Sequence, residues 1–495
     1  MQEVPKQATT DQSAASDDRS ELRRGVIVNG LGYLPKLAVP VLLVLVIRTY
    51  GADAFGLFTF AQAVLLFVCR IALLGFDKGI LWWTPQQDKD NALTGFAESF
   101  TINTLIALCL TALIAGVLAP SFATWGETPE ATQALRLMSC ALIPMVMMEL
   151  FLASTMGLKR MEPNVLVRET LLPIANVGLA LLLAPFTSGV AGLAIAFVTS
   201  YALAALVSFA WWRRLHGRTG PLFRFALPPT PFIRYSLPMW LAEMANSFQQ
   251  RMDTYFITAY LDLRLLGIYA AVVQIANAIR SIRRSFDPIV LVIASEIGSK
   301  NASERLRSCY SYATYLVTAT QLPVLVFVIV FAHWLMPLFG DGFEAGVTAV
   351  IVLCSFWVFN SPFSLAGIVV SAYGYSGLAL LNVGIGILGQ AICLWWLVPL
   401  YGLNGAATAV GLGYTLLSLV QVGQMRWVTG QWNCEVRVLI PAFVGLTACV
   451  VGFACWHYLL VENLNNSLVA RVGAFLIFLG LYGSGLWLDK RRERA

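Results

Sequence analysis

Residues 54–77 read AFGLFTFAQAVLLFVCRIALLGFD, an apolar run that holds one arginine, Arg70, and ends on Asp77. A transmembrane helix needs about 20 consecutive, mostly apolar residues, so this run is long enough to cross a bilayer. An arginine at the centre of such a helix costs roughly 2.5–3.5 kcal/mol on insertion scales and usually faces a cavity or a partner. The stretch therefore predicts a spanning helix that turns a charge away from lipid.

Similar runs recur along the whole chain. Hydrophobic residues make up 58% of the 495 positions and charged residues only 12%, whereas soluble domains carry roughly 25% charged residues. The predicted fold class is an all-α polytopic membrane protein with about fourteen transmembrane helices. The expected spans are 26–47, 54–76, 97–119, 134–157, 165–184, 189–212, 235–259, 265–287, 311–332, 345–372, 377–398, 403–425, 437–460 and 468–488.

Basic residues alternate between the predicted loops. Residues 213–234 hold five arginines, whereas the loops PSFATWGETPEATQ, HWLMPLFGDGFEAG and LVENLNNS hold no Lys or Arg. By the positive-inside rule both termini are expected on the cytoplasmic side of the cell (inner) membrane. The first twenty residues are polar and acidic and lack the features of a signal peptide, so a disordered cytoplasmic tail is expected there.

An internal repeat divides the chain. The pattern Arg-x5-Phe-Asp occurs twice with an offset of 210, and matching Gly-x-x-Gly segments open the sixth and twelfth spans with an offset of 213. The offset covers six spans, an even number, so the two halves are expected to insert in the same direction with a substrate site between them. The matching anchors are Gly56 and Gly267, Arg70 and Arg280, and Tyr201 and Tyr414.

The repeat predicts two parallel six-helix lobes followed by two C-terminal helices. No connection is long enough to hold a soluble domain, so catalytic residues are not expected. The predicted parts are a disordered cytoplasmic tail (1–22), a first lobe (23–212), a basic cytoplasmic linker (213–234), a second lobe (235–426), and two further helices with a basic tail (427–495).

Charged and polar side chains concentrate in four of the predicted spans. In the first, seventh and eighth spans they follow each other at intervals of three or four residues, which places them on one face of each of these helices. Unpaired cations in a membrane cavity favour a polyanion, and arginine binds phosphate oxygens in pairs. The predicted substrate-binding cations are Lys36, Arg70, Arg280, Arg283 and Arg284. The predicted polar lining consists of Asn29, Glu243, Asn246, Gln250, Asp253, Gln274 and Asn277.

Two other interpretations of these charges stay open. In the first, the charged residues form interhelical ion pairs, such as Glu243 with Arg251 or Arg284 with Asp287. In the second, they lie at the membrane interface with their charged ends in water. Ion coupling is predicted for Glu149 and Asp287. For Glu149 an ion pair with Arg168 is an equal alternative.

The sequence offers little for a cofactor. The nine cysteines are scattered without a Cys-x-x-Cys pair, and there are only three histidines, so neither a metal site nor a disulfide framework is expected. The net charge of +6 is small and lies in loops and termini, which indicates membrane orientation and not nucleic-acid binding.

Two matching stretches carry a family resemblance. RTYGADAFGLFTFAQAV (48–64) and YLDLRLLGIYAAVVQ (260–274), with the Gly-x-x-Gly openings, resemble the polysaccharide and O-antigen flippases of the multidrug/oligosaccharidyl-lipid/polysaccharide (MOP) superfamily. The resemblance implies a V-shaped, MATE-like pair of lobes, a cationic cavity and alternating access driven by an ion gradient or the membrane potential. The implied substrate is a polyprenyl-diphosphate-linked oligosaccharide for surface polysaccharide biosynthesis. A monomer that works beside a glycan polymerase or ligase is expected.

Three rival functions remain. The first is a flippase for the peptidoglycan lipid precursor, from a sister branch of the same superfamily. The second is a multidrug/cation antiporter, whose relatives usually use an acidic site in the first lobe, where the first span here offers Lys36 and no acid. The third is a membrane glycan polymerase or ligase, which would be expected to carry a large outer loop that this chain lacks.

Overall fold

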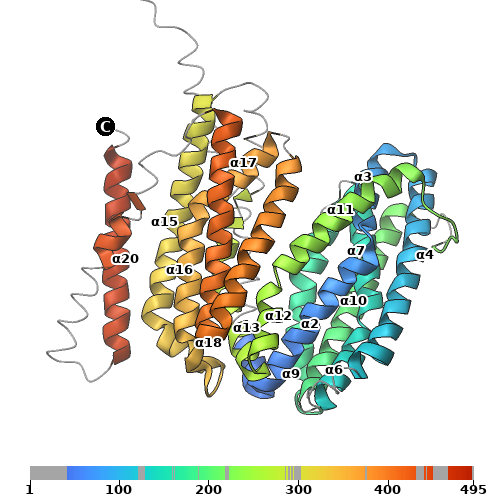
Figure 1. The fold of residues 1–495 in the computed structure, drawn as a ribbon, viewed down its shortest axis with the longest axis horizontal. Coiled ribbons are helices and arrows are strands. Elements are labelled where there is room, and N and C mark those ends of the chain that lie inside the picture. Colours follow the sequence, from blue (N-terminus) through green and yellow to red (C-terminus); the bar gives the residue numbers. More distant parts are fainter. Residues whose placement is uncertain are drawn as a thin grey trace, which may run out of the picture. The chain divides into compact units, whose positions relative to one another are not determined.

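The computed structural model describes residues 42–120, 129–158, 160, 162–187, 189–217, 222–284, 286–287, 290, 294, 303–373, 376–430, 440–441, 443–449 and 467–492. Every regular element within these ranges is helical (Figure 1). Ten of the described helical segments are long and apolar enough to cross a membrane. The prediction of an all-helical, multi-pass membrane protein is therefore confirmed.

The predicted count of fourteen spans stays a prediction. The segment Leu381–Thr429 contains two expected spans, because Gly402 (φ 56°, ψ −129°) breaks the helix between them. The expected first and thirteenth spans lie largely outside the described residues. Large apolar side chains on the helices stay exposed, among them Leu206 at 66% and Trp395 at 67%. Such surfaces fit lipid as the surrounding solvent.

The described chain divides into two compact units. The N-terminal unit comprises described residues between 35 and 270, and the C-terminal unit comprises those from 271 onward. The predicted lobe boundaries stay a prediction. The helices after the expected linker, α11 and α12, belong to the N-terminal unit, where α11 packs along α2 and α3.

The helices of the N-terminal unit are α2 (Ala52–Leu73), α3 (Phe76–Trp83), α4 (Lys89–Leu113), α6 (Pro129–Ser139), α7 (Leu142–Gly157), α9 (Leu172–Leu183), α10 (Val190–His216), α11 (Thr230–Gln249) and α12 (Met252–Tyr260), with the short helical turns η1 (Thr84–Gln86), η2 (Ile114–Leu118), α8 (Glu162–Asn164) and η3 (Val165–Leu171). The unit boundary falls inside α13 (Leu263–Arg284).

The second predicted span breaks near its end. Leu74 (φ 48°) and Gly75 (φ 72°) both adopt the left-handed conformation, which stops α2 at Leu73 and starts α3 at Phe76. Glycine accepts this conformation without strain. The break places Asp77 in the first turn of a new helix, so that its carboxylate approaches the end of α2.

Two repeat-related glycines meet in the N-terminal unit. A Cβ on Gly56 would collide with the carbonyl oxygen of Leu263 and lie 2.9 Å from the amide nitrogen of Gly267. A Cβ on Gly267 would in turn collide with the carbonyl oxygen of Ala52. The start of α2 and the start of α13 therefore cross backbone to backbone, which only residues without a side chain permit.

The C-terminal unit contains α15 (Ser303–Leu335), α16 (Val347–Ser364), α17 (Ala366–Ala372), α18 (Ser376–Thr429) and α20 (Ser467–Arg492), with the short turns η4 (Met336–Phe339) and η5 (Phe343–Gly346). Its core joins Phe286 to side chains of α15, α17 and α18. α20 lies beside α15 (Figure 1), and the Tyr482 hydroxyl donates to the Ala319 carbonyl at 3.2 Å.

Candidate functional site

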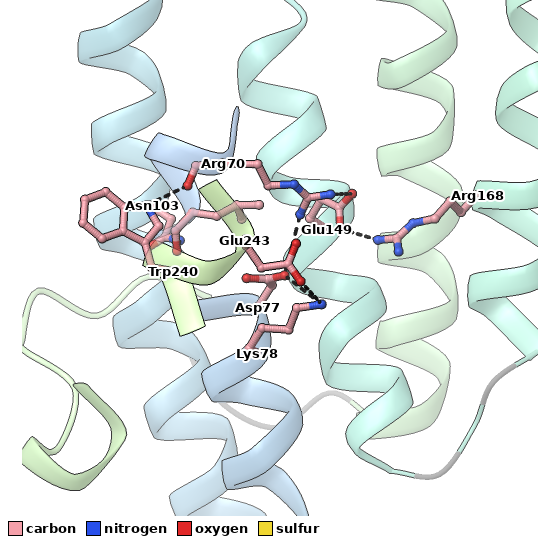
Figure 2. Close-up of polar contacts among 9 residues, drawn as sticks. Arg70, Asp77, Lys78, Asn103, Glu149, Arg168, Trp240 and Glu243 are labelled. Atoms are coloured by element: carbon pink, nitrogen blue, oxygen red, sulfur yellow. Dashed lines mark hydrogen bonds and ion pairs between the residues drawn. The ribbon is translucent and has the colours of Figure 1, made fainter. Parts of the chain in front are cut away.

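Arg70 lies at the end of α2 within reach of two carboxylates. Its guanidinium is 3.8 Å from Asp77 on α3 and 3.9 Å from Glu149 on α7. Glu149 also accepts a hydrogen bond from Arg168 in the π-helical turn η3. Figure 2 shows Glu149 between the two arginines. The carboxylate thus joins three separate helical segments of the N-terminal unit.

Lys78 extends the same cluster to a further helix. Its ammonium lies 3.1 Å from Glu243 on α11 and 4.0 Å from Asp77 (Figure 2). The cluster contains three basic side chains, Arg70, Lys78 and Arg168, and three acidic ones, Asp77, Glu149 and Glu243. Its formal charge at neutral pH is therefore zero.

Polar side chains also satisfy the backbone where α2 breaks. The indole of Trp240 donates to the carbonyl of Arg70 at 2.9 Å (Figure 2), and the amide of Asn103 donates to the carbonyl of Leu73 at 2.8 Å. The last carbonyls of a helix lack intrahelical donors, so these bonds stabilise the break. Arg70 is held in place from its backbone as well as from its guanidinium.

These contacts correct part of the sequence-based prediction. Arg70 is not an unpaired cation, because Asp77 and Glu149 balance it. Glu149 does pair with Arg168, as the alternative prediction stated, while its role in ion coupling stays a prediction. The polar residue Glu243 pairs with Lys78, which the sequence placed in a loop, and not with Arg251.

The C-terminal unit contains a cavity of about 610 Å³ beside the end of α13. It lies among α13, α16, α17 and the part of α18 that follows Gly402. Its lining consists of Arg280, Arg283, Asp287, Trp357, Asn360, Ser361, Ser364, Gly367, Ile368, Ser371, Tyr414, Leu417, Ser418 and Gln421. The lining thus combines cations, aromatic rings, hydroxyls and amides.

Arg280 is held by aromatic rings instead of carboxylates. The centre of its guanidinium lies 4.4 Å from the ring centroid of Trp357 and 5.2 Å from that of Tyr414. Its Nη2 lies 3.5 Å from the Tyr414 hydroxyl, at the outer limit of a hydrogen bond. Within the described part of the chain, no carboxylate oxygen lies within ion-pair distance of Arg280. Its charge is therefore available to a ligand.

The neighbouring arginines of α13 differ from Arg280. Arg283 makes two parallel contacts with Asp287, at 3.0 and 3.2 Å, so this cation is paired. The alternative pair of Arg284 with Asp287 is not the one found, and Arg284 is exposed outside the cavity lining. Of the predicted cations on α13, only Arg280 combines a cavity with the lack of a carboxylate partner in the described chain.

The remaining predicted site residues are dispersed. Asn29 and Lys36 lie outside the described residues. Asp253 is buried and accepts hydrogen bonds from the Thr254 amide at 2.8 Å and the Tyr269 hydroxyl at 3.1 Å. The side chains of Asn246, Gln274 and Asn277 are half-buried and lie outside the cavity lining, while that of Gln250 is exposed.

Most residues of the cavity lining are not among the site residues predicted from the sequence. Tyr414 was predicted only as a repeat anchor, and Trp357 and Asn360 had no predicted role. The signal for Asn360 was an amide inside the apolar run 345–372, where a polar group needs a partner or a cavity. No group of three or more His, Cys, Asp and Glu side chains suited to a metal ion occurs among the described residues.

Several solved structures share this fold. The lipid II flippase MurJ in an inward closed conformation is 13% identical, with a TM-score of 0.76 over 94% of this chain and 99% of that chain. An inward-facing multidrug resistance MATE transporter of the MOP superfamily is 16% identical, with a TM-score of 0.59 over 83% and 94%. A MOP transporter from Pyrococcus furiosus, whose binding pocket is described as having reverse polarity, is 16% identical, with a TM-score of 0.57 over 85% and 97%.

At 13–16% identity, these likenesses show that the chain has the fold of these membrane flippases and transporters. Residues 45–347, more than half of the chain, match the sequence profile of the family described as "Polysaccharide biosynthesis protein". The chain belongs to this polysaccharide biosynthesis protein family. No curated protein sequence matches it.

Proposed function

We propose that this protein is a flippase that moves a polyprenyl-diphosphate-linked oligosaccharide across the cytoplasmic membrane for surface polysaccharide biosynthesis. The observation that carries the proposal is Arg280, which lines a cavity of about 610 Å³ without a carboxylate partner in the described chain. The family, whose members are polysaccharide biosynthesis proteins, supports a glycan as the cargo.

The physical task of such a flippase is to carry a diphosphate through a medium of low dielectric constant. An isolated anion there is strongly unfavourable, and a guanidinium offers both opposite charge and paired hydrogen-bond donors. Arg280 supplies these donors beside a polar lining for sugars. The polyprenyl tail stays in lipid while the two halves alternate their access, driven by an ion gradient or the membrane potential.

We further propose an oligomeric state, a membrane location and a topology for this protein. The protein works as a monomer in the cytoplasmic membrane, with both termini on the cytoplasmic side, and delivers its glycan to a polymerase or ligase. The basic predicted loops support this orientation. The other predicted cations, Lys36, Arg70, Arg283 and Arg284, stay secondary in the proposal, because none combines a described cavity position with an unneutralised charge.

Complementation in the native host tests the proposal. Deletion of the gene should abolish the surface glycan and cause lipid-linked oligosaccharide to accumulate, and the wild-type gene should restore export. Arg280→Ala should restore less than about a tenth of export, as expected when a charge-assisted contact is lost. The matched control Arg234→Ala removes an exposed arginine on α11 and should restore export fully.

Membrane levels of each variant are compared by immunoblot, so that loss of transport is separated from loss of protein. An unchanged surface glycan after gene deletion contradicts the proposed function. Full export by Arg280→Ala contradicts the role of Arg280.

A second candidate is a flippase for the peptidoglycan lipid precursor. The observation that favours it is the structural likeness to MurJ over 94% of this chain. At 13% identity, this likeness shows a shared fold and not a shared substrate. Expression of this gene in cells depleted of their own lipid II flippase separates the two. Restored growth supports the second candidate, while continued lysis with normal membrane insertion supports the glycan flippase.

A further inference from the structure

The two repeat-related arginines lie in opposite electrostatic surroundings. In the N-terminal unit, the fourth predicted span contributes Glu149 to Arg70. In the C-terminal unit, the corresponding tenth span, now α16 and α17, contains no Asp or Glu between residues 347 and 372. Arg70 is thus neutralised inside its unit, whereas Arg280 keeps a charge that its own helices do not balance.

Trp357 and Tyr414 position Arg280 without neutralising its charge. A guanidinium over an aromatic face is attracted by the ring and leaves its N–H donors free for an anion. The two rings, with centroids 4.9 Å apart, both lie against the guanidinium. The arrangement therefore prepares a fixed cation at the wall of the cavity.

Three serines of the lining offer hydrogen-bond acceptors. The hydroxyl of Ser361 donates to the Trp357 carbonyl at 2.7 Å, and that of Ser364 donates to the Ser361 carbonyl at 3.0 Å. The hydroxyl of Ser371 likewise donates to the Gly367 carbonyl at 2.9 Å. Because these protons are used within the helices, the hydroxyl oxygens remain as acceptors toward the cavity.

Asn360 adds a buried amide oxygen to the acceptors of the lining. Its side chain is 2% exposed, and in the described part of the chain its Oδ1 has no hydrogen-bond partner. A buried carbonyl oxygen without a donor is unfavourable, so a donor from a ligand would stabilise it. The cavity thus pairs a cation with acceptors that need O–H or N–H donors.

We infer that this cavity is a subsite for a phosphate-bearing sugar. Arg280 holds the phosphate, and the Asn360 Oδ1 accepts a hydrogen bond from a sugar hydroxyl, with the serine oxygens as further acceptors. The volume of about 610 Å³ lies within the range of roughly 300–1,000 Å³ usual for small-molecule sites. The inference rests on the proposed function, in which the substrate carries a sugar directly on a diphosphate.

Binding to the full-length protein in nanodiscs tests the inference. The probes are glucose 1-phosphate, inorganic phosphate and glucose, followed by saturation-transfer NMR. Wild type should bind the sugar phosphate at least threefold more tightly than phosphate, and glucose most weakly, because the first probe alone uses both the cation and the acceptors. Failure to bind the sugar phosphate, or equal affinity for phosphate, overturns the inference.

Variants assign the two contacts. Asn360→Leu should reduce sugar-phosphate affinity to that of phosphate and leave phosphate affinity unchanged. Asn360→Asp places a carboxylate in the cavity and should weaken both anions by about tenfold or more. The control Asn404→Leu changes another amide, whose Oδ1 also lacks a partner in the described chain but lies outside the cavity lining, and should change neither affinity.

If an Asn360 variant does not fold, Arg280→Gln serves as a second test. This variant should lower the affinity for glucose 1-phosphate and for phosphate about tenfold. A preference for sugar phosphate that survives Asn360→Leu, or phosphate binding that survives Arg280→Gln, overturns the assignment.

A short-chain prenyl-diphosphate-linked sugar in the nanodisc distinguishes a membrane source from a soluble one. It should compete with glucose 1-phosphate, and lack of competition overturns the link to the flipped substrate. These binding results do not depend on export. A chain that exports normally with an altered Asn360 contradicts only the subsite, and a chain whose deletion leaves export intact contradicts only the proposed function.

Discussion

The carboxylate of Glu149 lies 3.9 Å from the guanidinium of Arg70, and its other oxygen accepts a hydrogen bond from Arg168. One acidic side chain, 12% exposed, therefore serves two arginines from different segments of the chain. Together with Asp77, Lys78 and Glu243, it closes a network of balanced charge between α2, α3, α7, η3 and α11. The network holds the N-terminal unit together.

We expect Glu149→Gln to destabilise the protein by about 2–3 kcal/mol, because two partly buried arginines lose their shared counter-charge. The thermal midpoint of the purified protein in detergent measures this effect. The control Glu162→Gln removes a carboxylate that is 67% exposed beside Arg160 and should leave the midpoint unchanged. Equal midpoints for wild type and Glu149→Gln would show that the network does not stabilise the fold.

Arg70→Ala and Arg280→Ala should fail in different ways. Arg70→Ala leaves Asp77 and Glu149 without one of their cations, so we expect a lower thermal midpoint and less protein in the membrane. Arg280→Ala removes a cation that has no carboxylate partner in the described chain, so folding should be retained while export is lost. Parallel measurement of midpoint and export separates the two, and a reversed pattern contradicts both assignments.

Gly56→Ala should destabilise the crossing of α2 and α13. Its new Cβ would collide with the Leu263 carbonyl, and forcing extra atoms into a packed contact typically costs about 1–3 kcal/mol. The control is Gly178→Ala on α9, where no atom lies within 4 Å of the new Cβ. This control should keep or slightly raise the midpoint, because alanine favours helices. A tolerated Gly56→Leu would rule out the close backbone contact.

Arg224 ties the segment before α11 to α4. Its backbone amide donates to the Thr101 hydroxyl at 2.8 Å, and its side chain lies 3.4 Å from the buried Glu98. Arg224→Ala should loosen this segment and accelerate chymotrypsin cleavage after Phe225, which is 83% exposed. Cleavage should occur in inside-out vesicles and not in right-side-out vesicles, as the predicted cytoplasmic position requires.

Arg234→Ala is the control for that experiment, because it changes an exposed arginine on α11 and should leave the cleavage rate unchanged. Cleavage only in right-side-out vesicles would contradict the predicted topology.

The sequence by itself determined the class of fold. Apolar runs of bilayer length predicted membrane helices, because a helix in lipid must satisfy its own backbone and present apolar side chains. The repeat of Arg70 at Arg280 marked the two equivalent positions, and the family resemblance was confirmed over residues 45–347. Local periodicity predicted a common face for Arg280, Arg284 and Asp287, whereas in the structure Arg283, and not Arg284, lines the cavity with the other two.

Only the tertiary structure decided which of those charges are balanced. Glu149 lies 79 residues from Arg70 along the chain, and Lys78 lies 165 residues from Glu243, so no local pattern relates them. Trp357 and Tyr414 likewise contact Arg280 from two other helices that are remote from it in the sequence. Whether a buried cation stays available for a ligand depends on the distances to groups remote in sequence, because electrostatic energy in a medium of low dielectric constant depends on those distances.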